Sequence, residues 1–544
     1  MAPTILLTSR GHTHDPQAMI RDFRSYVNGA HINTDVCVIG AGAAGLSLAR
    51  EFIGARTRVL LVESGGLKQE SSTDLLNWGE SVGLTLNGLH EGRGRAFGGT
   101  TKLWAGQCAR LDDLDFEARS WVPYSGWPIT KFDLAPFYVR AEALFRIPGQ
   151  VYDERVWRKF GVCPPDLDGS KLGYGFTVFS PRPDLGRLYR REFERSTNVQ
   201  VLLHANATKI HVNDYASAIK HLDIRTLEGK TGRVTARAFV LCCGGIENAR
   251  LLLLSDQIKP NGLGNRHDLV GRFFQDHPNG YTAVLQTNSP SVLQEHYSLL
   301  YSSGIRYFPK ISLSTAVQKA QRVLNCVSHP VYEYGAGSGI GAIREVYRSL
   351  TRRQWPKGLG REVGHMIKEL DQIAATVYRR YARGRSTAST PSLIRLQVHS
   401  EQAPNPRSRV SLSRERDALG LRKAQVDWRL THLERRTVET MTNTVDAEFC
   451  RLGFARSRAA DWLVDEAEDW PIYFSDAYHH IGTTRMADDP KKGVVDSDCQ
   501  VHGVAGLYVA GGSVFPTSGC AGPTLTIVAL ALRLADHLKS TLVG

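Results

Sequence analysis

A glycine-rich turn near residue 40 has the residue types and spacing that bind the pyrophosphate of a dinucleotide. The apolar run 35–39 leads into a Gly-x-Gly-x-x-Gly turn at residues 40–45, a helical pattern follows, and a second apolar run, 58–62, ends at Glu63. The first glycine permits the tight turn, the second lets the backbone approach phosphates, and the third lets the helix lie close to the strand. Glu63 is placed to accept hydrogen bonds from an adenosine ribose. Glycines that serve packing alone are the alternative, which this ordered context disfavours.

A second glycine cluster, residues 92–106, is basic and also contains aromatic and apolar side chains. Backbone N–H groups of such a loop can surround a phosphate or a flat ring. A surface loop is the alternative interpretation, but Phe97, Leu103 and Trp104 are poor choices for exposed positions. We therefore expect this loop to contact the ligand of the first turn.

Two further apolar runs end in glycine pairs. Residues 238–243 precede one pair and a helical pattern, and residues 506–510 precede another pair, after which a strongly apolar helix is predicted over 523–538. In open α/β sheets, ligands lie beyond the carboxyl ends of the strands. The three strand-to-glycine turns are therefore expected to meet at one edge of a sheet built from separated segments.

Composition limits the class of protein. The chain has 544 residues, 42% of them hydrophobic and 22% charged, which is typical of a globular protein and excludes collagen, coiled-coil and disordered classes. At ~150 residues per domain, this length fits roughly three to four domain equivalents or one large two-part enzyme. The net charge of +13 favours anionic partners. Nucleic acid is not expected, since the sequence contains none of the usual reading modules.

The cysteines and the lengths of the apolar runs predict the cellular compartment of the protein. The nine cysteines, an odd number, include no Cys-x-x-Cys pair, which indicates reduced thiols rather than a disulfide framework. The early apolar run at residues 5–7 is too short for a signal peptide, and no run approaches the ~18 apolar residues of a membrane span. We expect a cytoplasmic enzyme without a metal site.

Together, these segments resemble the glucose–methanol–choline (GMC) family of FAD-dependent oxidoreductases. The matching stretches are 35–66, 92–106, 238–255, 270–278 and 478–538. The block 476–538 is the most diagnostic, and the sequence is most similar in style to the sugar-oxidising branch that includes pyranose oxidases and glycoside dehydrogenases. A nicotinamide enzyme would explain the first glycine turn but not the C-terminal block.

The resemblance implies an α/β fold with two parts. One is a Rossmann-type FAD-binding domain of discontinuous segments, expected at 34–110, 200–290 and 490–544. The other is a substrate-binding domain with an antiparallel sheet, expected at 111–199 and 291–489. Residues 1–33 are expected to form an N-terminal arm or an added short helix.

Residues 344–385, inside the expected substrate-binding domain, are unusually basic. They contain eleven Lys and Arg residues and four Asp and Glu residues, a net charge of +7. Such a segment predicts either peripheral contact with an anionic membrane or the solvated face of a lid, which is the commoner meaning of a charge run.

The implied reaction transfers a hydride from an alcohol carbon to the flavin while a base removes the hydroxyl proton. The resemblance assigns that base to His479, the first residue of a His479-His480 pair. A neutral imidazole, which titrates near neutrality, suits the task. His480 is expected either to support His479 or to serve packing.

Two positions depart from the family pattern. Leu103 stands where members with covalent flavin carry a His, which predicts non-covalent FAD. Gly522 stands in the turn 521–524 where the family has a His or an Asn. Either another residue holds the substrate oxygen, or the substrate or reaction differs. The helix that begins at Pro523 still directs its positive end toward the flavin.

The predicted cofactor contacts come from all of these segments. They are Gly40, Gly42, Ala43, Ala44, Gly45, Glu63, Ser64, Arg95, Gly98, Gly99, Thr100, Thr101, Leu103, Trp104, Ala105, Ala207, Cys243, Gly244, Asn248, Gly512, Ser513, Gly522, Pro523 and Thr524. The leading hypothesis is an FAD-dependent dehydrogenase or oxidase for a sugar or glycoside, re-oxidised by oxygen, a quinone or a redox protein. The alternatives are a same-fold enzyme for an apolar or natural-product substrate, and a membrane-associated flavoprotein with little turnover.

Overall fold

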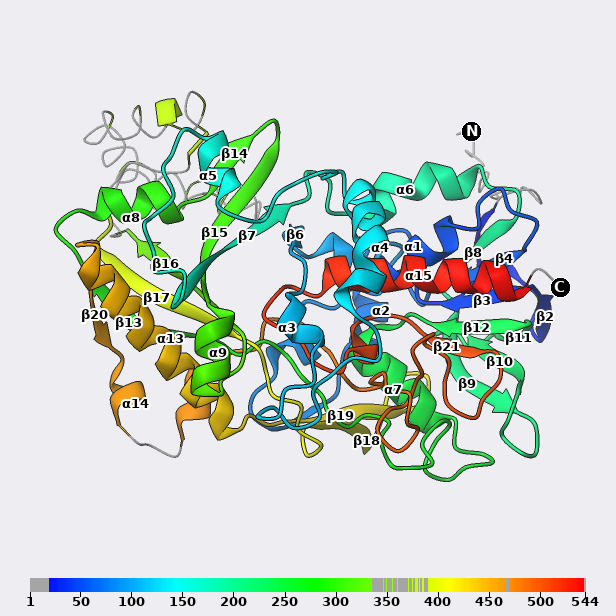
Figure 1. Ribbon diagram of the computed structural model, residues 1–544. Helices are drawn as coiled ribbons and strands as arrows, with labels where there is room; N and C mark the ends of the chain where they lie inside the picture. Colours follow the sequence, from blue (N-terminus) through cyan, green and yellow to red (C-terminus); the bar gives the residue numbers. More distant parts are fainter. Residues whose placement is uncertain are drawn as a thin grey trace, which may run out of the picture.

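The computed structural model describes residues 19–334, 390–465 and 469–542, together with scattered positions between 346 and 385. Two lobes lie side by side in Figure 1: the one drawn on the right contains a parallel sheet, and the one on the left contains a large antiparallel sheet. Most of the basic segment 344–385, for which membrane contact or a lid is predicted, lies outside the described residues.

Six parallel strands form the sheet of the first lobe. Their order is β1 (Ile20–Asp22), β8 (Val199–Leu203), β4 (Val59–Val62), β3 (Val36–Ile39), β12 (Ala238–Leu241) and β21 (Leu507–Val509). Every neighbouring pair is parallel. Strands β3, β4, β12 and β21 are buried along their whole length, which is why they appear in the sequence as continuous apolar runs. The predicted sheet of separated segments is confirmed.

Helices connect these strands and place their N-termini at one edge of the sheet. Helix α1 (Ala43–Arg50) begins directly after β3, and α7 (Gly244–Leu254) begins directly after β12. Helix α15 (Thr524–Leu542) packs against α1 and against α4 (Lys131–Leu144). The apolar length of α15 is therefore explained by its position between two other helices in the core.

Residues 20–33 do not form the predicted arm. Strand β1 pairs with β8, and β2 (Ala30–Asn33) pairs with β11 (Thr231–Thr235) in a four-stranded sheet completed by β10 (Ile219–Arg225) and β9 (Asn206–Val212). Both strands are short, half-buried and at sheet edges, so they leave no long apolar pattern in the sequence. The prediction for 1–33 is wrong for this part, and residues 1–18 lie outside the described ones.

An eight-stranded antiparallel sheet forms the second lobe. Its path runs through β20 (Arg456–Ala459), β13 (Asn279–Gln286), β17 (Leu393–Ser400), β16 (Cys326–Glu333), β15 (Ile305–Leu313), β7 (Leu172–Phe179) and β6 (Gln107–Cys108), and β14 (Leu300–Ser302) pairs with β15. All of these pairs are antiparallel. The predicted sheet-rich second part is confirmed.

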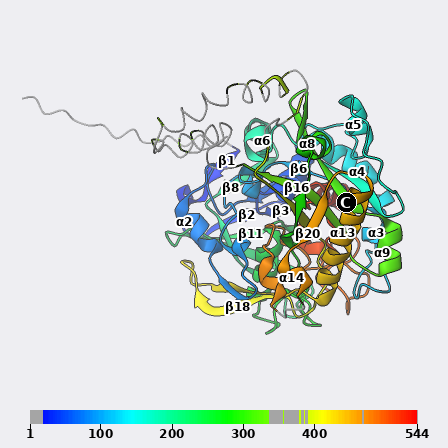
Figure 2. The same cartoon turned by 90° about the vertical axis from the view of Figure 1, so that its left-hand side faces the viewer.

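Helix α13 (His432–Arg451) packs against four neighbouring strands of this sheet, β16, β17, β13 and β20. Figure 2 shows the molecule from this side, with α13 and β20 in front. Along β17, buried and half-buried residues alternate. His399 is one of the half-buried residues, and it lies on the opposite face of the strand from the buried Ile394, Leu396 and Val398.

A fourth sheet, of three strands, shows that the two parts of the chain interweave. It contains β18 (Arg409–Arg416), β19 (Arg422–Trp428) and β5 (Glu80–Gly83), and it packs against α7. The range 291–489 predicted for the substrate-binding domain includes β18 and β19, whereas β13 of the antiparallel sheet begins within 200–290. Among the helices of the described ranges, none is long and apolar enough to cross a membrane.

Candidate active site

One cavity lies at the carboxyl ends of β3, β4 and β12, and segments from across the chain line it. The predicted residues among its lining are Gly40, Gly42, Ala43, Ala44, Glu63, Ser64, Arg95, Gly99, Thr100, Thr101, Trp104, Ala207, Cys243, Gly244, His479, His480, Gly512, Pro523 and Thr524. The fold therefore brings the glycine turns, the basic loop and the histidine pair together at one site.

Three glycines shape this cavity: one allows two strands to approach closely, and two leave space for a ligand. A Cβ on Gly40 would lie 2.7 Å from the carbonyl oxygen of Cys242, and Gly40 adopts a φ of +101°. By contrast, a Cβ on Gly42 or on Gly244 would meet no protein atom within 4 Å. Gly40 is thus needed for the approach of β3 to β12, whereas Gly42 and Gly244 leave room for a ligand at two helix N-termini.

The buried carboxylate of Glu63 is held by the backbone of the glycine turn. It accepts hydrogen bonds from the N–H groups of Ala41, at 2.8 Å, and Gly65, at 2.9 Å. Burial raises the pKa of Glu63, and these two N–H groups and the nearby Arg95 oppose that effect. Glu63 therefore braces the turn against β4 while it lines the cavity.

Seven predicted contacts do not line the cavity. They are Gly45, Gly98, Leu103, Ala105, Asn248, Ser513 and Gly522. Asn248 accepts from the N–H of Cys243, at 2.8 Å, and donates to the hydroxyl of Ser513, at 2.9 Å. Asn248 therefore joins the turn that follows β12 to the turn that follows β21, and it does not contact the cavity. A Cβ on Gly45 would lie 1.9 Å from the Gly40 carbonyl oxygen, so that glycine serves helix–strand packing.

A buried ion-pair network was not anticipated from the sequence. Arg93 and Arg95 contact the two oxygens of Glu247, at 2.8 and 3.2 Å, and Arg250 lies 3.2 Å from the same carboxylate. Burial alone would raise the pKa of Glu247, but the three guanidinium groups hold it well below its usual range. Arg93, Glu247 and Arg250 all line the cavity. The Gly-Arg-Gly-Arg run at 92–95 was the available signal for Arg93.

The two adjacent histidines turn in different directions. His480 packs its ring near that of Phe274, with centroids 5.8 Å apart, and its buried Nε2 makes no hydrogen bond. Burial, and next Arg93, lower the pKa of His480 to about 3. Tyr478, just before the pair, has a φ of +62°, an uncommon backbone conformation that reorients the chain at this point.

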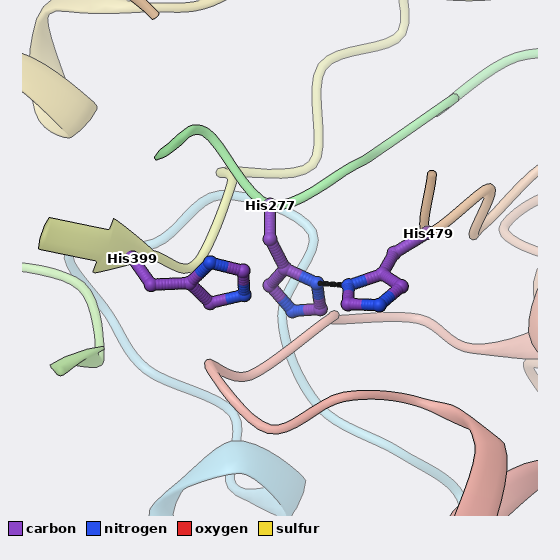
Figure 3. Close-up of side chains that lie close together, drawn as sticks. All are labelled: His277, His399 and His479. Carbon is purple, nitrogen blue, oxygen red and sulfur yellow. Dashed lines mark hydrogen bonds between the residues drawn. The ribbon is translucent and has the colours of Figure 1, made fainter. Parts of the chain in front are cut away.

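His479 belongs to a cluster with His277 and His399, shown in Figure 3. Nδ1 of His479 lies 2.8 Å from Nδ1 of His277, whose Nε2 lies 2.8 Å from the carbonyl oxygen of Gly519. The ring of His399 stacks on His277 with centroids 4.9 Å apart. The sequence analysis missed His277 and His399 because they approach His479 only in the folded chain. His277, for example, is 202 residues away from His479 in the sequence.

Asp276 fixes the backbone on both sides of this cluster. Its carboxylate accepts from the N–H groups of His277, at 2.7 Å, Ala477, at 2.9 Å, and His479, at 3.0 Å. Burial, and next the charge of Asp476, raise the pKa of Asp276 to about 7, against the lowering effect of these N–H groups. The two histidine-bearing segments are therefore joined through one buried acid.

Gly522 lies beside His479, as the sequence comparison with the family pattern implied. A Cβ on Gly522 would have the Cε1 atom of His479 at 3.9 Å and the carbonyl oxygen of Gln107 at the same distance. Pro523 and Thr524, at the start of α15, line the same cavity as His479. The base candidate and the positive end of a long helix thus border one space.

Comparisons with known proteins agree with this arrangement. The family model for GMC oxidoreductases matches residues 404–531, and that for FAD-dependent oxidoreductases matches residues 35–262. The large subunit of fructose dehydrogenase from Gluconobacter japonicus is 24% identical over 94% of this chain and 98% of its own. C-glycoside 3-oxidase from Microbacterium trichothecenolyticum is 38% identical over 22% of each chain.

A solved structure of formate oxidase has the same fold. It superimposes with a TM-score of 0.56 at 16% identity, over 95% of this chain and 99% of its own. The first glycine turn lies within the range matched by the FAD-dependent oxidoreductase model, and the histidine pair lies within the range matched by the GMC model. The chain is thus similar to GMC oxidoreductases over residues 404–531 and to FAD-dependent oxidoreductases over residues 35–262.

Proposed function

We propose that this enzyme oxidises an alcohol group of a sugar or glycoside, with non-covalent FAD as hydride acceptor and His479 as the general base. The observation that carries the proposal is the place of His479, which lines the same cavity as the glycine turn 40–45 and the start of α15. A base at this place lies between the cofactor site and the lobe with the antiparallel sheet.

The residues present fit a flavin dinucleotide. Gly42 and Gly244 leave space where their side chains would stand, each at the N-terminus of a buried helix. Those helix starts suit the pyrophosphate, and the start of α15 suits the electron-rich end of the flavin. Arg95 and Thr100 line the cavity from the basic loop. When bound, FAD supplies the acceptor for the hydride.

His479 is prepared to remove the hydroxyl proton. Burial, followed by the charges of His277, His480 and Lys310, holds the pKa of His479 well below its usual range. The imidazole is therefore neutral at pH 7, which is the state that accepts a proton. Its backbone N–H donates to Asp276, which holds the main chain at this residue in place.

The names of relatives support a carbohydrate substrate. Fructose dehydrogenase and C-glycoside 3-oxidase are both named for sugar oxidation. Gly522 supports the alternative, an apolar or natural-product alcohol, because no side chain there can hold the polar oxygen of a sugar. Since one relative is a dehydrogenase and another an oxidase, the electron acceptor stays open among oxygen, a quinone and a redox protein.

Anaerobic bleaching of the flavin tests the proposal. The purified enzyme is mixed without oxygen with sugars, glycosides, diols and long-chain alcohols, and the flavin absorbance is followed. We expect bleaching by at least one sugar or glycoside and none in buffer alone. Bleaching by apolar alcohols only would favour the alternative, and bleaching by none of these donors would contradict alcohol oxidation altogether. Mixing the reduced enzyme with oxygen or a quinone then identifies the acceptor.

Leu103 supports non-covalent binding of FAD. It cannot form a bond to the flavin, it is 44% exposed, and it does not line the cavity. We expect acid precipitation to release all of the flavin into the supernatant. Yellow colour that remained with the precipitated protein would contradict this part of the proposal.

The basic segment 344–385 supports a separate proposal of contact with an anionic membrane surface. Its eleven cationic residues would be attracted to acidic lipid headgroups. Co-sedimentation with liposomes that contain or lack acidic lipid tests it. Equal recovery of the protein in both supernatants would leave only the lid interpretation.

A further inference from the structure

We infer that His277 is a positioning residue that fixes His479 in the one neutral tautomer whose Nε2 is free to take the substrate's proton. The inference rests on the proposed role of His479 and extends it to a residue that lies 202 positions away. It follows from three groups in a row: the carbonyl of Gly519, the ring of His277 and the ring of His479. Figure 3 shows the two rings and the hydrogen bond between them.

The position of each proton follows from the ends of this row. A carbonyl oxygen only accepts, so Nε2 of His277 carries a proton and donates to Gly519 at 2.8 Å. A neutral imidazole has one N–H, so Nδ1 of His277 is an acceptor. The 2.8 Å contact between the two Nδ1 atoms then requires that His479 donates from its Nδ1. Nε2 of His479 is left with a free lone pair.

The surroundings keep both rings neutral. Burial lowers the pKa of His277 to about 4, although Gly519, Ser518 and Glu401 oppose it. The groups that face the row from other elements are His399 on β17, Lys310 on β15, His480 beside it, and Glu401, which is paired with Arg119 at 2.8 Å. In the described part of the chain, no carboxylate hydrogen-bonds to a ring nitrogen of either histidine.

A neutral acceptor differs chemically from the carboxylate that often orients a catalytic histidine. The O–H bond of the alcohol breaks and an N–H bond forms at Nε2 of His479. At the same time, the carbon that bears the hydroxyl gives up a hydride to FAD. His479 then carries a positive charge that the neutral ring of His277 does not cancel. The base consequently stays weak and unprotonated down to acidic pH. Gly522, which adds no polar side chain, leaves this orienting contact to His277.

Three substitutions of His277 separate orientation from simple packing. His277→Leu removes the acceptor, His277→Asn places an amide oxygen near the position of Nδ1, and His277→Asp places a carboxylate there. The rate constant of flavin reduction at saturating substrate is measured against pH, with FAD content and thermal stability recorded. His399→Leu is the matched control, since His399 stacks on His277 without a hydrogen bond to His479.

We expect the Leu variant to keep FAD and to reduce it between about 10-fold and 100-fold more slowly, because the base loses its orientation. The Asn variant should recover most of this loss. In the Asp variant, the carboxylate stabilises protonated His479, so the acid limb of the rate profile should move to higher pH by at least about one unit. The His399→Leu variant keeps the hydrogen bond between His277 and His479, so its acid limb should not move.

A spectroscopic measurement is independent of turnover. Long-range ¹H–¹⁵N spectra of the holoenzyme labelled with ¹⁵N-histidine should show His479 protonated at Nδ1, with assignment from His479→Ala, and the Leu variant should lose this single form. An Asn variant no faster than Leu, an unmoved acid limb in Asp, or a proton found on Nε2 of His479 would overturn the inference. If no donor bleaches the wild-type flavin, the proposed function fails, but the spectrum still decides the tautomer.

Discussion

Two histidine clusters in this molecule differ in a single kind of neighbour. On the outer four-stranded sheet, His211 and His221 stack with centroids 4.3 Å apart, and Asp223 lies 2.7 Å from one ring and 3.3 Å from the other. In the active site, His277 contacts His479 and His399, and no carboxylate joins them in the described part of the chain. The first cluster contains an acid and is half-buried throughout, whereas in the second His277 is fully buried and no acid among the described residues contacts the rings.

The difference shows which surroundings suit the role proposed for His479. At the surface, partial burial and His211 lower the pKa of His221, but the carboxylate of Asp223 opposes them. In the active site, burial and then His277, His480 and Lys310 all lower the pKa of His479. The buried rings are therefore kept as neutral bases, whereas a nearby carboxylate would favour their protonated form.

The largest expected effect comes from removing the proposed base. His479→Ala should keep FAD but reduce it at least ~100-fold more slowly, the lower end for loss of a general base. The measurement is stopped-flow flavin reduction with the best donor of the panel. His480→Ala, whose ring packs near Phe274, should cost less. A His479→Ala enzyme with a near-normal rate would place the base elsewhere.

The second prediction concerns stability at acidic pH. The unfolded chain protonates His277 near pH 6.5, but the folded protein keeps it neutral down to about pH 4. Its contribution is therefore complete above pH 6.5 and is lost as the pH falls toward 4. The free energy of unfolding decreases between pH 7 and pH 5. In the His277→Asn variant, this decrease should be smaller than in the wild type by about 2 kcal/mol.

Urea unfolding of the wild type and the Asn variant at both pH values measures this difference. His221→Asn, in the half-exposed surface cluster, is the matched comparison and should flatten the loss less. Identical pH dependence in the wild type and the His277 variant would show that His277 is protonated in the folded enzyme, which would remove the contrast between the two clusters.

The smallest effect is expected from the acid of the surface cluster. Asp223→Asn should lower the free energy of unfolding by at most about 1 kcal/mol, since exposed ion pairs contribute little, and added salt should reduce the effect. Flavin reduction should not change. A clear loss of flavin reduction in this variant would mean that the surface cluster is coupled to the active site.

The sequence predicted what is encoded locally. The turn at 40–45 is recognisable because its glycines, its strand and its helix are consecutive, and the buried strands are continuous apolar runs. Strand β1 was missed because three half-buried residues at a sheet edge carry no pattern. His277 was missed as a partner of His479 because nothing between them in the sequence indicates their contact. The prediction of His479 as the base came from the family resemblance and not from residue spacing.

The row of Gly519, His277 and His479 also has a consequence for how the enzyme is assembled. Its members are 242 and 202 residues apart in the chain, and contacts of such long range form late because their loop entropy must be overcome first. The FAD cavity is likewise lined by segments from both ends of the chain. During refolding, turnover should therefore appear late, and its delay should lengthen when the contacts of His277 are weakened.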